Sequence, residues 1–346
     1  MIMKRTIFVM LLVVLVLALA ACGKEAETVQ SPEPQEVQPA VQEETVQEPA
    51  VEEQTPLERA AAYLISAVQD PTVGSTFGDW AVLGLARSGV DVPEGYFETY
   101  YKNVETYVRD CQGVLDTRKY SEYSRVILAL TAIGKVPNDV AGYDLTAPLG
   151  DYDQTVFQGI NGPAFALLAL DSANYEMPVC PEGKTQAIRE DYVLLLLEKE
   201  LEGGGWSFAG GTMEADMTAM VLQALAKYQD AEPVAEAVER GINALSAVQN
   251  ANGGFSVGGE ENSEVVSQVI VALGELGIPL DDPRFVKDGK GLMDALISYQ
   301  NGDGGFSHLP GGKTDQMATE QAFYAMVAAQ RLADGKSALY DMNDVE

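Results

Sequence analysis

The stretch QNANGGFS at residues 249–256 recurs as QNGDGGFS at 300–307 and as ELEGGGWS at 200–207. Before the middle copy, residues 234–248 carry apolar side chains at helical spacing on one side only, which predicts an amphipathic helix. After it, residues 265–273 are apolar nearly all round, which predicts a helix buried on both sides. A two-helix unit of about 50 residues therefore recurs, and this repeat determines the fold.

Six segments have the character of the buried helix: 78–88, 122–134, 162–173, 216–228, 264–276 and 317–333. Half-exposed helices alternating with fully buried ones predict two concentric layers. Six inner helices, each backed by an outer one, close into an all-α α/α toroid. An open superhelical solenoid is the alternative, although it would expose inner helices at its ends and the chain shows no obvious polar capping repeat.

The Leu-x-x-x-Gln-x-x-x-Gly-x-aromatic pattern resembles the repeat of the terpene-cyclase and protein-prenyltransferase superfamily, whose squalene-cyclase-type repeats build an α/α toroid. The stretch QGINGP at 158–163 adds a resemblance to bacterial cell-surface proteins with prenyltransferase-type repeats. The resemblance covers residues 57–340. It is clear in the last three repeats, fair in the first, and weak in the second and third, which lack the Gly-Gly-aromatic turn.

The N-terminus is typical of a secretory signal peptide: Lys4 and Arg5 precede an apolar run over 7–21. As a helix that run reaches about 22 Å, short of the roughly 30 Å hydrocarbon core of a bilayer. The run ends in LAACG at 19–23, which resembles the lipobox of bacterial lipoproteins. The resemblance implies cleavage after residue 21 and a diacylglyceryl group, with acyl chains such as palmitate, on Cys22. An ordinary signal peptide with a chance cysteine is the alternative.

Residues 22–56 are expected to form the lipidated cysteine and a disordered acidic linker. From residue 24 on, this stretch holds nine Glu and one Lys and no aromatic residue, so it cannot bury enough apolar surface to fold. The chain carries −30, of which the linker accounts for −8 and the signal peptide for +2, which leaves −24 for the toroid domain at 57–346. Such a domain repels phosphate backbones, so nucleic acid is excluded as a partner. The expected location is the extracellular face of the cell membrane, with the lipid anchor as the membrane contact.

Inner helices begin at one end of a toroid, where side chains can line a cavity. Glu214 and Asp216 stand at such a start. Hopene-type cyclases place an aspartate-rich motif at a comparable start, and the resemblance makes both residues candidate catalytic acids. The Glu-x-Asp-Met sequence is not a multi-aspartate run, and helix capping, with Asp216 as N-cap, explains both residue types equally well.

Aromatic residues of the repeats could line a cavity: Trp80, Tyr123, Phe165, Trp206, Phe255, Phe306 and Tyr324. Phe255 and Phe306 belong to the recurring turn and are expected to fill the core. Three of the other rings, together with polar groups at inner-helix starts, are the predicted ligand-binding residues: Trp80, Tyr123, Asn161, Trp206, Glu264 and Gln321.

A zinc site of the prenyltransferase kind is not expected, because His308 is the only histidine and stands in a Gly-rich turn. No metal ion or cofactor is predicted. Cys111 and Cys180 could form a disulfide in an exported chain, and two free thiols are the equal alternative.

Three classes of function remain. The first is a surface protein whose toroid binds a small molecule, largely apolar or corrinoid-like, with a glycan as a further option; its protein partners are unknown. The second is an enzyme, either cyclase- or prenyltransferase-like with Asp216 as acid, or a glycosidase pairing Glu214 or Asp216 with Glu264. The third is an interaction scaffold, which predicts a filled barrel where the others predict an open cavity lined by Trp80 and Trp206. The lipid anchor favours binding, because a surface protein has no access to cytosolic prenyl donors.

Overall fold

A computed structural model describes residues 54–180 and 182–345 of the chain. The predictions for the signal peptide, Cys22 and most of the linker lie outside the described residues. Within them, no helix is both long and apolar enough to cross a membrane.

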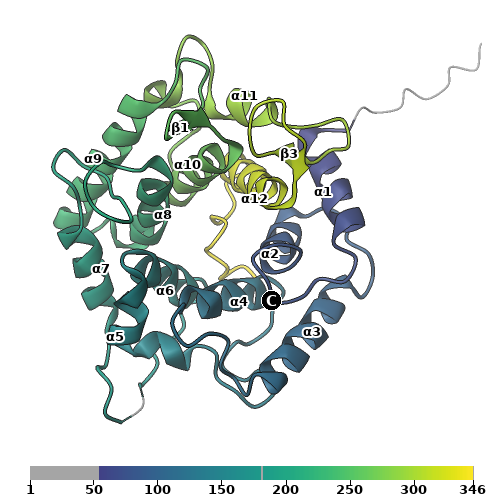
Figure 1. The fold of residues 1–346 in the computed structure, drawn as a ribbon, viewed down its shortest axis with the longest axis vertical. Helices are drawn as coiled ribbons and strands as arrows, with labels where there is room; N and C mark the ends of the chain where they lie inside the picture. Colours follow the sequence, from purple (N-terminus) through teal and green to yellow (C-terminus); the bar gives the residue numbers. More distant parts are fainter. Residues whose placement is uncertain (1–53, 181, 346) are drawn as a thin grey trace, which may run out of the picture. The chain divides into compact units, whose positions relative to one another are not determined.

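The inner layer is a closed ring of six helices (Figure 1). Each packs on the next, and the last packs on the first. They are α2 (Asp79–Ser88), α4 (Ser121–Ala132), α6 (Asn161–Asp171), α8 (Ala215–Leu225), α10 (Ser263–Leu276) and α12 (Gln316–Ala333). The predicted α/α toroid is therefore confirmed, and ring closure excludes the open solenoid.

The outer layer is less regular. It consists of α1 (Pro56–Ala67), α3 (Tyr96–Asp110), α5 (Tyr152–Thr155), α7 (Arg189–Glu198), α9 (Glu232–Val248) and α11 (Leu292–Ile297). Around α5, the 3-10 helices η1 (Ala147–Gly150) and η2 (Val156–Gln158) replace most of an outer helix, in the part of the chain where the repeat is weak. The short helices η3 (Ala226–Tyr228) and η4 (Pro283–Phe285) lie in connections.

Two antiparallel hairpins stand where inner helices begin. Strand β1 (Ser256–Val257) pairs with β2 (Glu260–Glu261) before α10, and β3 (Phe306–Ser307) pairs with β4 (Thr314–Asp315) before α12. Each hairpin continues directly from a Gly-Gly-Phe turn. The hairpins lie at the end of the barrel where the inner helices start, and we call this end the mouth (Figure 1). Val257 of β1 lines the cavity there.

The repeated turn packs against the next outer helix of the ring. Gly204, Gly253 and Gly304 have φ of +97°, +86° and +91°, which favours glycine. A Cβ on Gly304 would lie 2.4 Å from the carbonyl oxygen of Arg59 in α1, and one on Gly204 would lie 2.7 Å from that of Arg240 in α9. The motif therefore requires glycine because two backbones approach closely.

The polar residue that opens each copy of the motif bridges the same interface. Gln300 donates to the carbonyl oxygens of Gly304 (3.0 Å) and Pro56 (2.8 Å), and so connects the turn to the first residue of α1. In the copy that has glutamate instead, Glu200 makes a bidentate ion pair with Arg240 of α9, at 2.7 and 2.8 Å. Both residue types thus fasten the turn to its neighbouring outer helix.

The chain after α12 closes the end of the barrel opposite the mouth. Figure 1 shows this C-terminal segment crossing the middle of the ring. Arg87, buried at the end of α2, donates to the carbonyl oxygens of Ala338, Leu339 and Asp341 at 2.8–3.1 Å and pairs with Asp344 at 2.6 Å. The segment is therefore held to the inner helices by many polar contacts.

Candidate functional site

A cavity of about 350 Å³ opens at the mouth. Five of the inner helices, the hairpins and the C-terminal segment line it, with Trp80, Phe165, Asp216, Met220, Gln223, Val257, Asn262, Glu264, Val265, Gln268, His308, Met317, Gln321, Tyr324 and Tyr340. Two wider surface grooves, of about 890 and 660 Å³, lie beside α1, and neither contains an aromatic ring. The mouth cavity, by contrast, has the rings of Trp80, Phe165, Tyr324 and Tyr340 and two carboxylates in its lining, a combination that suits a binding site.

One wall of the cavity is aromatic. The Trp80 ring lies 5.7 Å from that of Tyr324 and 6.2 Å from that of Phe165, centroid to centroid, with tilts of 53° and 43°. Trp80 and Phe165 remain partly exposed, whereas Tyr324 is buried. These three rings, the aromatic wall, offer an apolar surface for a ring or alkyl group of a ligand.

A chain of amides adjoins the aromatic wall. The Gln223 side chain donates to the Gln268 side-chain oxygen at 3.0 Å, and Gln268 donates to the Gln321 side-chain oxygen at 3.0 Å and to the Tyr324 hydroxyl at 2.6 Å. Burial raises the pKa of Tyr324, so its hydroxyl stays protonated and keeps a proton to donate. This amide chain has fixed geometry, which suits orientation of a ligand's polar groups.

Two carboxylates lie at the entrance. Asp216, in the first turn of α8, accepts a hydrogen bond from the N–H of Met217 at 2.9 Å. Glu264, in the first turn of α10, contacts Nδ1 of His308 at 2.8 and 2.9 Å and accepts from the Ser263 hydroxyl at 3.1 Å. Both carboxylates come from different helices and line the same cavity.

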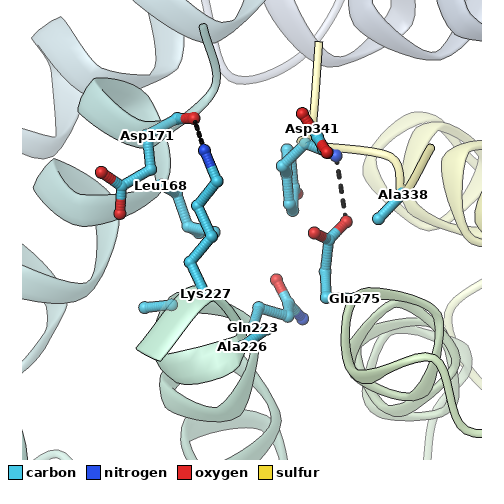
Figure 2. Close-up of a pocket in the computed structure, with 10 residues that line it drawn as sticks. Leu168, Asp171, Gln223, Ala226, Lys227, Glu275, Ala338 and Asp341 are labelled. Atoms are coloured by element: carbon cyan, nitrogen blue, oxygen red, sulfur yellow. Dashed lines mark hydrogen bonds between the residues drawn. The ribbon is translucent and has the colours of Figure 1, made fainter. Parts of the chain in front are cut away.

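Tyr340 and Gln223 form the floor, since both also line a second, smaller cavity of about 110 Å³ on the far side of the C-terminal segment. Figure 2 shows that cavity: the Glu275 carboxylate accepts the N–H of Tyr340 at 2.9 Å, and the Lys227 ammonium donates to the carbonyl oxygen of Asp171. Withdrawal from solvent raises the pKa of Glu275 to about 7. The mouth cavity is therefore a pocket with a floor, entered from one end.

Four of the predicted catalytic and ligand-binding residues, Trp80, Asp216, Glu264 and Gln321, line the mouth cavity. Phe165 and Tyr324, from the aromatic set of the repeats, line it as well. Asp216 is not the N-cap of its helix. That position belongs to Glu214, so the capping interpretation of Asp216 is wrong.

The other sequence candidates lie elsewhere. Glu214 accepts from the N–H of Phe208 at 2.7 Å, outside the cavity lining. Trp206 is fully buried and its indole N–H donates to the carbonyl oxygen of Leu196 at 2.6 Å, so it fills the core as Phe255 and Phe306 do. The Tyr123 hydroxyl accepts from the N–H of Leu115 at 3.0 Å. Asn161 begins α6, and its side-chain oxygen is buried without a hydrogen-bond partner among the described residues.

Several lining residues were missed. Gln223 and Gln268 are long polar side chains within mostly apolar stretches of inner helices, a signal that could have identified them. His308, which the sequence places in a Gly-rich turn, is exposed, and it also contacts Glu264 at the cavity. Tyr340 follows the last repeat, where no periodic pattern points to it.

Cys111 and Cys180 are free thiols in the structure. Across residues 54–180 and 182–345, no cluster of three or more His, Cys, Asp or Glu side chains could hold a metal ion.

A second polar cluster is buried between α2, α3, α4 and α12. Asp79 pairs with Arg125 at 2.6 Å and accepts from the Tyr100 hydroxyl at 2.5 Å. Nearby, Glu320 is fully buried and accepts from the N–H of Phe77 at 2.7 Å. Burial raises the pKa of Glu320 to about 7. The cluster is closed to solvent, so its role is to position helices.

No protein-family model and no curated protein matches this chain. Known structures do match. The type II terpene cyclase MstE from Scytonema, in its apo form, superposes with a TM-score of 0.52 at 11% identity, over 80% of this chain and 98% of that chain. Unsaturated glucuronyl hydrolase from Bacillus sp. GL1, described as responsible for the degradation of glycosaminoglycan, superposes with a TM-score of 0.53 at 14% identity, over 82% and 97%. At such identities the likeness shows the α/α-toroid fold alone.

Proposed function

We propose that this protein is a lipid-anchored, extracellular ligand-binding protein whose toroid holds a small amphipathic organic molecule in the mouth cavity. The observation that carries the proposal is the convergence of an aromatic wall, an amide chain and two carboxylates on one cavity of about 350 Å³. A scaffold would need no such pocket. Pockets that bind small molecules combine apolar walls with a few placed polar groups in this way.

The lining favours a ligand with both apolar and polar faces. An unbroken isoprenoid chain would leave the Gln223 side-chain oxygen and the Gln321 side-chain N–H groups, which the amide chain itself does not pair, facing hydrocarbon, and each unpaired polar group costs free energy. A volume of about 350 Å³ stands at the lower end of the range for small-molecule pockets, which favours a ligand smaller than a corrinoid.

The proposed location rests on the sequence around Cys22 and on the acidic linker that follows. A lipid anchor with a long charged tether would present the mouth to the cell exterior at some distance from the bilayer. Binding at the cell surface then requires only that the ligand reach the open end of the barrel.

Native mass spectrometry of the full chain, purified in detergent from cells that produce it naturally, tests the proposal. We expect the wild-type protein to retain a non-covalent small molecule. Met317→Trp, which fills the cavity entrance, should lose it, because Met317 lines the cavity and is 41% exposed there. The matched control is Val248→Trp, which also adds a large ring at an exposed position but at the end of α9, outside the lining of the mouth cavity, and which should keep the molecule. Equal occupancy in the wild-type protein and Met317→Trp, or an empty wild-type protein, would refute the proposal.

A second candidate is an enzyme, because Asp216 and Glu264 line the same cavity from different helices. Two carboxylates flanking a bound substrate are what acid–base hydrolysis of a glycoside needs, and Asp216 is also the candidate acid for cyclase-like chemistry. Asp216→Asn separates the candidates. A pure binding protein has no turnover to lose, whereas an enzyme would still bind its substrate and stop converting it.

A further inference from the structure

The mouth cavity is acidic and lacks a strong cationic side chain. Of its lining residues, Asp216 and Glu264 are carboxylates, and none is Lys or Arg. Among the described residues Asp216 takes part in no ion pair. The one ion-pair partner of Glu264 there is His308, which is itself more than half exposed. Negative charge at the entrance is therefore left for a ligand to balance.

The aromatic wall attracts the same kind of charge. The face of an aromatic ring carries negative electrostatic potential, and a cation within about 6 Å of its centroid is stabilised, most strongly by Trp. Trp80 stands in the middle of the wall, with Phe165 and Tyr324 on either side. A desolvated site strengthens this attraction.

Two unpartnered groups in the cavity add to the site. The hydroxyl of Tyr340, a residue only 4% exposed, has no hydrogen-bond partner among the described residues and lines the floor. The side-chain oxygen of Gln223, a residue 3% exposed, accepts no hydrogen bond from them either. Both oxygens can accept hydrogen bonds from an N–H or O–H of a ligand.

The field of the whole domain acts in the same direction. Residues 57–346 carry a net charge of −24, which is what remains of the chain's −30 once the −8 of the linker and the +2 of the signal peptide are taken away. A cleft in a strongly acidic protein concentrates cations near its opening. The aromatic wall, the carboxylates at the entrance and the net charge of the domain thus all favour a positively charged ligand.

We infer that the ligand of the mouth cavity is an organic cation, a substituted ammonium whose alkyl groups face the aromatic wall while its charge lies near Asp216 and Glu264. This inference rests on the proposed function, since it specifies what the cavity binds. Neutral glycans and other uncharged ligands are the outcomes that the test below separates from it.

The test compares ammonium compounds with neutral carbon isosteres. The probes are choline against 3,3-dimethyl-1-butanol, and acetylcholine against 3,3-dimethylbutyl acetate, added to the full chain in detergent and followed by tryptophan fluorescence. The chain has two tryptophans; Trp206 is buried in the core, so a signal lost in Trp80→Phe comes from the cavity. We expect each ammonium compound to bind at least about ten-fold more tightly than its isostere.

Asp216→Asn, which removes the charge with little change in size, should reduce that preference several-fold. The control Glu236→Gln removes a charge from the exposed outer face of α9 and should leave the preference unchanged. If neither ammonium compound binds more tightly than its isostere, the inference is wrong. A neutral molecule recovered by native mass spectrometry from the wild-type protein, and lost in Met317→Trp, would overturn the inference while upholding the proposed function; an empty cavity would overturn both.

Discussion

Arg87 should hold the barrel's closed end in place, and Arg87→Ala tests how strongly. Its side chain is 3% exposed and makes five contacts to the C-terminal segment, namely three carbonyl oxygens, the Ser337 hydroxyl and the Asp344 carboxylate. Asp344 is 43% exposed and keeps its ion pair with Arg331, so the cost of Arg87→Ala comes mainly from the three carbonyl oxygens that lose their donor, about 1–3 kcal/mol for each one left buried and unpaired. We therefore expect the free energy that docks the segment to fall by about 3–5 kcal/mol.

Hydrogen exchange is the appropriate assay, because the segment can detach while the ring of helices stays folded. The N–H of Met342 donates to the carbonyl oxygen of Ser172 at 2.7 Å and reports on docking. A loss of 3 kcal/mol or more should speed its exchange by at least about 100-fold. The control Arg240→Ala breaks an ion pair with Glu200 in the outer layer, in which the Arg side chain is 47% exposed, and should leave exchange at the Met342 N–H close to the wild-type rate. Exchange at Met342 within ten-fold of the wild-type rate would refute this reasoning.

Three further predictions concern stability, each measured by chemical denaturation of the full chain. Because the pKa of Glu320 is raised from 4.5 to about 7, the folded protein holds a proton that the unfolded chain releases, so stability should fall by about 3 kcal/mol as pH rises from 4.5 through 7. Glu275, whose pKa is also raised to about 7, adds a dependence of the same sign, so Glu320→Gln should remove only the part due to Glu320; an unchanged pH profile would contradict the assignment. Gly304→Ala should destabilise by about 1–3 kcal/mol, since φ is +91° and a Cβ would meet the Arg59 carbonyl oxygen. Gly302→Ala, which has open space around it, should change stability by less than about 0.5 kcal/mol; similar effects for both would disprove the close-approach argument. Trp206→Ala should cost about 3–5 kcal/mol, and a loss below 1 kcal/mol would show that the ring is not packed as described.

The repeat predicted the architecture because its physical signals are local. Inner helices buried on all sides are apolar all round, and helices such as α9 keep one wet face, so both layers can be read from periodicity. The Gly-Gly-aromatic turn marks each unit, because the glycines allow close backbone approach and the ring fills the core. Where these signals fade, around α5, the outer helix itself is reduced to four residues.

The site was less predictable, because it depends on which repeated positions face the axis. Trp206 occupies the turn position that buries its ring in every clear repeat, whereas Trp80 is the second residue of α2 and faces the cavity. The link between Gln223 and Gln268 joins residues 45 positions apart, and only the closed ring brings them together. Tyr340 lies in the C-terminal segment, which follows the last repeat. Its position on the cavity floor depends on tertiary contacts such as the hydrogen bond from its N–H to Glu275.

We propose that the mouth cavity holds its ligand against Trp80. The most direct measurement is a crystal structure of the protein taken from the cells that make it and crystallised without added ligand. We expect electron density for one organic molecule between the Trp80 ring and the amide side chains of Gln268 and Gln321, within reach of Asp216. Water alone in the cavity, or a molecule bound elsewhere on the toroid, would contradict it.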